Sequence, residues 1–286
     1  ARARENQWGF VDFNRPMVAI NQWEQAEDSM YTLCGKDRIH PSTDGHLVMA
    51  YLFLKAQGLA GKPVADIRID GAGKKVTRSD NCRVSDLSVS SDNLTFTYEA
   101  KSLPYPIDTS YYDNEKHTQA DALSVIPFMD EMNYEGLSVS GLSDGYYGLT
   151  IGGEFIGRFT ARELERGINM ALLQNTPQYK QAMKIRQMNE ERWLKERKMR
   201  EFYWVEYNLM RKTGMLWACN EAAVDTLRKY RPHDIFLQWN GDLWLQYMHK
   251  GIREDCVNEQ QDLVNRIYEQ NKPIPLRIEI KKFTDL

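Results

Sequence analysis

Two changes in hydrophobic pattern divide this 286-residue chain into three parts. From about Ala60 to Phe159, apolar and polar residues alternate in short runs between turn residues, the two-residue period of β-strands. After Thr160, apolar residues recur at helical spacing within long charged runs. Before Ala60, an apolar run is followed by one helical pattern. The sequence therefore predicts a mixed α/β protein with residues 1–59 as one part, a β-rich segment over 60–159 and a mainly helical segment over 160–286.

Composition excludes several classes of protein. The chain is 42% hydrophobic and 27% charged, as globular proteins are, and its formal net charge of −3 gives no overall attraction to nucleic acid. No apolar run approaches the roughly 20 residues of a membrane helix. The four cysteines are widely spaced without a C-x-x-C pair, which excludes a finger-type zinc site and leaves one disulfide bridge open.

The first part reads as the end of an α/β sandwich. The apolar run Trp8 to Phe13 predicts a strand buried on both faces of a parallel sheet. A short helical piece is expected around Gln22 to Met30, and a longer helix from Asp44 to Gln57 packs against the strand. Because no partner strand precedes Trp8, we expect the chain to begin in the middle of a domain.

The β-rich segment ends in a stretch of apparent hairpins, "LSVSGLSDGYYGLTIGGEFIGRF". Two dipeptides with glycine, Asp144-Gly145 and Gly152-Gly153, predict the tight turns of successive hairpins. Thr160 followed by Glu163 forms a capping box and predicts the start of a helix there. Thr176-Pro177 predicts the start of a second, long helix.

Asp37 and His40 stand three residues apart in the stretch "GKDRIHPSTDGHLVMAYLFL". A general base needs a neutral imidazole with one nitrogen facing the nucleophile and the other held by an acceptor, and a carboxylate at this spacing supplies that acceptor. Pro41 restricts His40 to extended backbone geometry. The alternative is a turn in which Asp37 and His40 simply cap the following helix, and spacing alone leaves both interpretations open.

The same stretch resembles the last motif block of the SGNH (GDSL-type) hydrolases, in which D-x-x-H-P precedes a helix and a Gly-His pair follows. Five residues match this pattern: Asp37, His40, Pro41, Gly45 and His46. The preceding "GFVDF" is similar to the final strand of the family, and "YYGLTIGGEFIGRFTARELERGINMALLQNTPQ" resembles a region that follows the catalytic domain in a bacterial subgroup. The two matches cover about a third of the chain.

The chain also departs from the family. The nucleophilic serine of the family lies in a Gly-Asp-Ser block, and its oxyanion donors are a Gly and the Asn of a G-x-N-D block, but Gly-Asp-Ser does not occur in this sequence. Asn240-Gly241-Asp242 has the wrong order and lies far beyond His40. The resemblance therefore implies the C-terminal part of an SGNH hydrolase, whose partner is the N-terminal part of the same domain.

The resemblance implies a flavodoxin-like three-layer sandwich and acyl transfer without a cofactor. In that chemistry a serine attacks an ester carbonyl, His40 takes its proton, and Asp37 orients His40. Acyl or acetyl esters, on small molecules or glycans, are the implied substrates, and frequent export in the family favours a periplasmic or secreted location. The rival hypothesis is a non-catalytic binding or scaffold protein derived from this family.

Another serine fits a nucleophile motif by letter alone. Gly141 to Gly145, "GLSDG", has the G-x-S-x-G form of the nucleophile elbow, which requires a strand before the serine and a helix after it. The sequence after Ser143 has the pattern of a strand, so we expect a serine in a hairpin turn. The remaining histidines, His117, His233 and His249, lack the spacing of a metal site.

Overall fold

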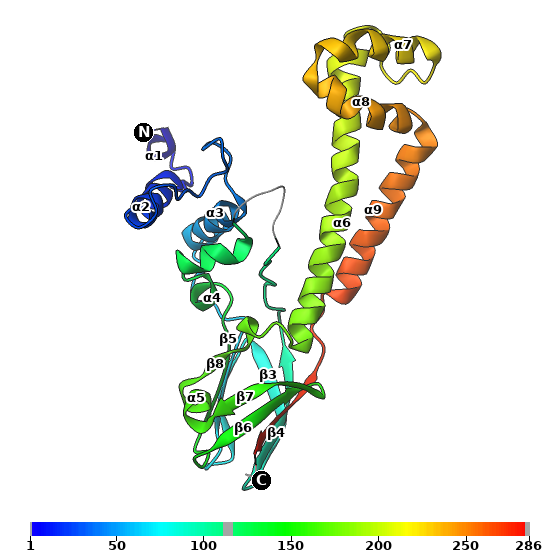
Figure 1. Cartoon of the computed structure of the whole chain (residues 1–286). Coiled ribbons are helices and arrows are strands. Elements are labelled where there is room, and N and C mark those ends of the chain that lie inside the picture. Colours follow the sequence, from blue (N-terminus) through cyan, green and yellow to red (C-terminus); the bar gives the residue numbers. More distant parts are fainter. Residues whose placement is uncertain (1, 111–116, 284–286) are drawn as a thin grey trace. The chain divides into compact units, whose positions relative to one another are not determined.

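The computed structural model describes residues 2–110 and 117–283. The chain divides into two compact units, Ala1–Ala182 with Pro273–Leu286 and Met183–Lys272 (Figure 1). The limits expected from the sequence, after residues 59 and 159, separate kinds of secondary structure, and as domain limits they stay predictions. The second unit is an insertion, because the chain returns from it to the first.

The first unit contains two sheets. The four-stranded sheet has the order β2 (Lys75–Asp80), β1 (Ala65–Asp70), β5 (Glu135–Ser140) and β8 (Ile168–Asn169). The five-stranded sheet has the order β3 (Cys82–Val89), β4 (Asn93–Ala100), β9 (Leu276–Lys282), β6 (Tyr146–Ile151) and β7 (Glu154–Thr160). β1 and β5 are parallel, whereas the other paired strands are antiparallel.

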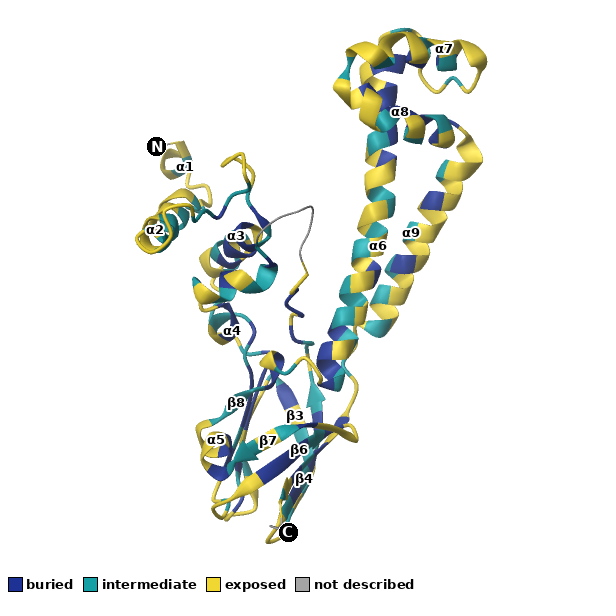
Figure 2. Cartoon of the chain, viewed as in Figure 1, coloured by how far each residue is buried: buried dark blue, intermediate teal, exposed yellow. Residues whose placement is uncertain are grey.

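One hydrophobic core joins the two sheets (Figure 2). Ile67 and Leu137 of the smaller sheet and Phe96, Leu149 and Ile278 of the larger sheet are at most 1% exposed. Along β4 the buried residues alternate with more exposed ones, as expected of a strand that covers a core on one side. With its two sheets and its helices, the structure confirms the expected mixed α/β class.

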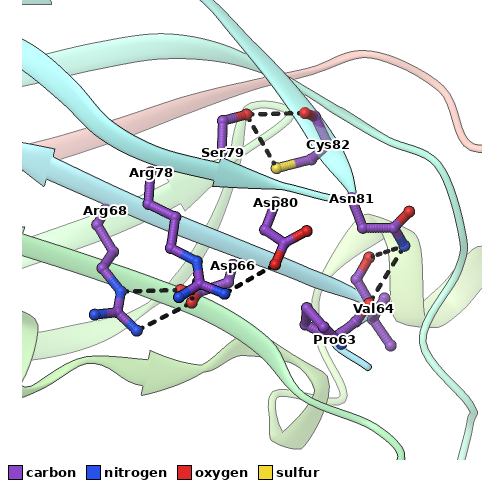
Figure 3. Close-up of polar contacts among 9 residues, drawn as sticks. All are labelled: Pro63, Val64, Asp66, Arg68, Arg78, Ser79, Asp80, Asn81 and Cys82. Carbon is purple, nitrogen blue, oxygen red and sulfur yellow. Dashed lines mark hydrogen bonds and ion pairs between the residues drawn. The ribbon is translucent and has the colours of Figure 1, made fainter. Parts of the chain in front are cut away.

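Asn81 makes the corner at which the chain passes from the smaller sheet to the larger one (Figure 3). Its backbone has φ +53°, a left-handed conformation that asparagine tolerates. Its side-chain amide donates to the carbonyls of Val64 (2.9 Å) and Pro63 (3.3 Å), which fixes the corner against the start of β1. Beside it, Oδ2 of Asp66 forms ion pairs with Nη2 of Arg68 (3.1 Å) and Nε of Arg78 (2.9 Å).

The segment over 160–286 contains two strands that the sequence reasoning missed, the two-residue β8 and the longer β9. β9 lies between β4 and β6 in the larger sheet, with Phe96 opposite Ile278 and Leu149 opposite Ile280. The alternation of Leu276, Ile278 and Ile280 with charged residues is the signal that could have revealed it.

One of the two expected hairpins forms. β6 and β7 are antiparallel and joined by Gly152 and Gly153, both with positive φ, as a two-residue hairpin turn requires. The hairpin expected at Asp144-Gly145 is wrong, because β5 and β6 belong to different sheets. The glycine-containing loop carries the chain between sheets instead of folding it back onto its neighbour.

Residues before Ala60 form helices α1 (Arg2–Glu5), α2 (Asn14–Glu24) and α3 (Thr43–Ala56). The strand expected over Trp8 to Phe13 is wrong for the described structure: these residues pair with no described strand, and Trp8 and Phe10 are 65% and 73% exposed. An apolar run alone does not supply the partner strand that a buried ladder needs. The helical piece expected around Gln22 to Met30 lies upstream, in α2.

α3 confirms the helix expected from Asp44 to Gln57. Its buried face, which includes Leu47, Val48 and Tyr51, packs with Leu33, with the 3₁₀ helix η1 (Gln119–Ser124) and with α4 (Phe128–Glu131). The expected packing against Trp8 to Phe13 is therefore replaced by packing against a later segment. The Tyr-, Pro- and Asp-rich stretch from Lys101 to Asp130 predicts a surface loop, but η1 and the start of α4 lie within it. Residues 111–116 of this stretch lie outside the described residues.

The capping box predicted at Thr160 and Glu163 is confirmed and opens α5 (Ala161–Arg166). After η2 (Met170–Leu172), the predicted long helix α6 (Pro177–Val205) continues into a π-helical turn, η3 (Glu206–Met210). The second unit is completed by α7 (Glu221–Tyr230), η4 (Arg231–His233), α8 (Ile235–Tyr247) and α9 (Lys250–Gln270).

A separate hydrophobic core, which includes Phe202, Leu227 and Trp244, holds the second unit together. Buried Glu206 accepts hydrogen bonds from the Trp244 indole (2.7 Å) and the Trp217 backbone (2.8 Å), so both of its carboxyl oxygens have partners inside the protein. Across both units, none of the helices among the described residues combines the length and apolar character that a membrane crossing demands.

Candidate functional site

A short loop between Leu33 and Ser42 carries Asp37 and His40. Two backbone hydrogen bonds close its stem: the Ser42 N–H donates to the Leu33 carbonyl (3.0 Å), and the Gly35 N–H donates to the His40 carbonyl (2.7 Å). Between them, the backbones of Cys34 and Pro41 form an isolated antiparallel β-bridge. At the tip, Arg38 has φ +56°, a conformation that non-glycine residues seldom adopt. The loop is therefore a defined backbone structure that fixes the direction of His40.

Gly45 lets this stem pack against the first turn of α3. A Cβ atom at this position would lie 2.0 Å from the Leu33 carbonyl oxygen and 3.1 Å from its carbon, both backbone atoms that cannot move aside. Only glycine allows the approach. The glycine of the sequence motif is thus required for steric reasons, because it lets the stem of the Asp37–His40 loop pack closely against the helix.

The structure brings Asp37 and His40 together. Oδ2 of Asp37 lies 2.5 Å from Nδ1 of His40, and Oδ1 accepts the backbone N–H groups of Ile39 (2.9 Å) and His40 (3.1 Å). The His40 side chain is 83% exposed, and within residues 2–110 and 117–283 its Nε2 has no hydrogen-bond partner. One ring nitrogen contacts the carboxylate and the other faces solvent, the arrangement that the catalytic interpretation requires, although the strand expected before this loop does not form in the described structure.

The hydrogen bonds around Asp37 favour its charged form. The contact with the His40 imidazole, followed by the two backbone donors, lowers the pKa of Asp37 from 3.8 to about 2. The carboxylate is therefore ionised at neutral pH. A charged acceptor at Nδ1 selects the tautomer that leaves Nε2 free to accept a proton. Chemically, such an arrangement can accept a proton at Nε2 from an incoming group.

A second aspartate–histidine pair, which the sequence reasoning missed, lies at the start of α3. Asp44 is 1% exposed; its Oδ1 accepts the Ser42 hydroxyl and the Gly45 N–H, and its Oδ2 lies 3.5 Å from Nδ1 of His117. The His117 ring packs edge-on against Tyr31, whose pKa is raised to about 12, mainly by burial and next by Asp44. Since 73 positions separate Asp44 from His117, no local spacing could have revealed the pair.

Ser143 lies in the loop between β5 and β6, not in a nucleophile elbow. Its hydroxyl accepts a hydrogen bond from Nζ of Lys282 (2.8 Å) and contacts the Tyr147 hydroxyl (3.1 Å), and strand β6 begins three residues later at Tyr146. The helix that the elbow requires after the serine is absent from this described stretch. Ser143 is thus outside a nucleophile elbow, as expected, but it lies in a loop between two sheets and not in the hairpin turn that was expected.

The remaining histidines do not build a further centre of this kind. His46 and His233 are exposed, and His249 contacts the Cys219 sulfur at 3.3 Å. Among the described residues, no group of three or more His, Cys, Asp and Glu side chains converges as metal ligands would.

The second unit matches a known family. Residues 183–272 fit the family described as the Diltiazem deacetylase C-terminal helical domain. This range is the same as that of the second compact unit, Met183–Lys272. The helical insertion is therefore similar to a domain found in deacetylases, while the match itself does not include the Asp37–His40 loop.

The whole chain is similar to a solved enzyme structure. A gut microbial diltiazem-metabolizing enzyme matches 98% of this chain with 42% sequence identity and a TM-score of 0.92. The chain spans 64% of the length of that enzyme. A comparison with curated proteins found no match.

Proposed function

We propose that this chain is part of a serine ester hydrolase of the SGNH (GDSL-type) family, in which His40 is the general base and Asp37 orients it. The observation that carries the proposal is the 2.5 Å contact between Asp37 Oδ2 and His40 Nδ1 beside an exposed Nε2. A turn that merely caps α3 does not account for it, because neither side chain bonds the first turn of that helix.

The comparisons support the reaction class. One similar domain is named for a deacetylase, and the similar solved structure is a diltiazem-metabolizing enzyme. Removal of an acetyl group from an alcohol is an acyl transfer to water, the reaction that an aspartate–histidine pair assists. We therefore propose acetyl esters of alcohols, including small drug-like molecules, as substrates.

The proposed reaction has two steps. His40 Nε2 takes the proton of a serine hydroxyl as its oxygen attacks the ester carbonyl, and returns it to the departing alcohol. Water then attacks the acyl-enzyme by the same route and releases the acid. Asp37 remains ionised throughout and stabilises the imidazolium form of His40.

We propose that the serine and the oxyanion donors come from Gly-Asp-Ser and G-x-N-D blocks outside residues 1–286. Neither block is present in this sequence, whereas the similar enzyme is longer than this chain. The exposure of Trp8, Phe10 and Ile39, at 65%, 73% and 74%, fits an apolar surface that the N-terminal part of such a domain covers.

The test compares residues 1–286 with the full-length product of the gene. The full-length protein is expected to hydrolyse p-nitrophenyl acetate and to react with a fluorophosphonate probe, and residues 1–286 alone to do neither above the level of a protein with similar histidine content. His40→Ala in the full-length protein lowers kcat by several orders of magnitude, because the members of such a site act as a unit.

Equal kcat values for the folded wild-type and His40→Ala proteins would refute His40 as the base. Absence of probe labelling in a folded full-length protein would favour the non-catalytic scaffold instead.

A further inference from the structure

The second unit carries a groove that the proposed ester hydrolysis does not use. Six residues line about 320 Å³: Trp193, Arg197, Arg200, Glu201, Trp204 and Asn240. Five of them come from α6 and one from α8. We propose that this groove binds a neutral oligosaccharide chain, independently of the acyl-transfer site.

The spacing of the two tryptophans indicates an elongated ligand. Trp193 and Trp204 are eleven residues apart, about three helical turns, so both indoles lie on one face of α6 about 16 Å from each other. A compact ligand contacts only one of them. A chain of repeated rings places one ring on each indole and the intervening rings over the residues between.

Both indoles are held as platforms. Trp193 is 46% exposed, and the guanidinium of Arg200 lies 5.7 Å from its ring centre. Trp204 is half-buried and packs against Phe236 with ring centres 5.2 Å apart. A rigid aromatic face loses little entropy on binding, and it suits the apolar C–H face of a pyranose ring.

The charges between the platforms are already paired. Arg197 bonds Glu201 at 2.7 Å, and Arg200 bonds Glu196 at 2.8 Å, each one turn apart on α6. The lining therefore presents donors and acceptors with little net charge, which favours a neutral ligand over an anionic one. The Asn240 amide makes no hydrogen bond within the described part of the chain, so its donor and acceptor are available to hydroxyl groups.

This chemistry also distinguishes a glycan from another helix. A helix docked in the same groove has to remove Arg197 and Arg200 from water at the centre of the interface. The free energy lost by desolvating them is larger than the free energy gained from their ion pairs. Hydroxyl groups of a sugar instead replace water molecules as hydrogen-bond partners. The mixed aromatic and polar lining thus fits a hydroxyl-rich ring polymer better than an apolar surface.

The test is gel retardation of the 286-residue chain by five neutral polysaccharides: hydroxyethyl cellulose, xylan, galactomannan, pullulan and dextran. At least one is expected to retard the chain, and Trp193→Ala to weaken that binding at least tenfold. The matched control is Tyr268→Ala, since Tyr268 is 69% exposed in the same unit but does not line the groove. The control variant is expected to bind as the wild type does.

Circular dichroism establishes that both variants are folded. Retardation by none of the five polysaccharides, or equal retardation of the wild type and Trp193→Ala, overturns the proposal. If the groove is instead a contact between two copies of the chain, Trp193→Ala alters the sedimentation coefficient without any polysaccharide. This result also overturns the proposal. None of these results depends on esterase activity.

Discussion

Two carboxyl groups of the first unit have pKa values displaced in opposite directions. Asp37 lies in a surface loop, and hydrogen bonds led by that of His40 lower its pKa to about 2. Glu135, on β5, is fully buried and accepts hydrogen bonds from Tyr98 (2.8 Å) and Gln178 (3.2 Å), yet burial raises its pKa to about 7. Both groups accept several hydrogen bonds, so exposure to water decides the direction.

The difference in burial between Asp37 and Glu135 indicates a different role for each carboxyl group. Near neutral pH, Asp37 is ionised at an exposed position, as its proposed role in orienting His40 requires. Glu135 holds the first turn of α6 to the sheet through Gln178 and is enclosed by the core. We therefore expect changes at Asp37 to alter activity and changes at Glu135 to alter stability.

The largest expected effect follows from removing the charge of Asp37. In the full-length protein, Asp37→Asn should lower kcat for p-nitrophenyl acetate at least about hundredfold, because an amide does not select the required tautomer of His40. The loss should be smaller than that in His40→Ala, since water replaces part of the orientation. Steady-state kinetics at saturating substrate measure both losses.

Asp86 is the matched control for this substitution. It is also an exposed aspartate with a lowered pKa, but its main partners are Thr97 and Ser85 rather than a histidine. Asp86→Asn should leave kcat within about twofold of the wild type. A similar loss in both variants would show that the effect of Asp37 is not specific to the imidazole.

An effect of about 3 kcal/mol on stability is expected from Glu135→Gln above pH 7. The pKa of Glu135 is 4.5 when unfolded and about 7 when folded, so wild-type stability is highest below pH 4.5 and falls as pH rises to about 7. A glutamine does not ionise, so the variant lacks this decline and is the more stable protein at pH 8.

Hydrogen exchange of the amides in β4 and β5 between pH 4.5 and 8, corrected for intrinsic rates, measures this difference. Activity of the full-length variant should equal that of the wild type. If wild type and Glu135→Gln show the same change of protection with pH, the buried carboxyl does not control the stability of this unit.

The smallest effect is expected at Ser143. Ser143→Ala in the full-length protein should leave kcat unchanged, because the hydroxyl bonds Lys282 and Tyr147 in a loop between two strands. Loss of most esterase activity in this variant would make Ser143 the nucleophile and displace the proposed Gly-Asp-Ser block.

The sequence predicted features that depend on neighbouring residues. The Asp37–His40 contact spans three positions, the α3 and α6 helices follow local hydrophobic patterns, and α5 begins at a capping box, so short stretches were sufficient. The strand β9 has a local alternation that was overlooked, but its pairing with β4 across the 90 residues of Met183–Lys272 is not visible in any short stretch. The contact of His117 with Asp44 likewise depends on a distant partner. The error at Trp8 to Phe13 has the same cause, since apolarity does not specify a partner strand.

The most direct test of the central claim is ¹⁵N NMR of the His40 imidazole in residues 1–286 at a pH where the ring is neutral. The account predicts a ring protonated at Nδ1 and bare at Nε2, because the Asp37 carboxylate accepts the Nδ1 proton. In Asp37→Asn this preference should be lost. A ring protonated mainly at Nε2 in the wild type, unchanged by Asp37→Asn, would contradict the assignment of His40 as a base oriented by Asp37.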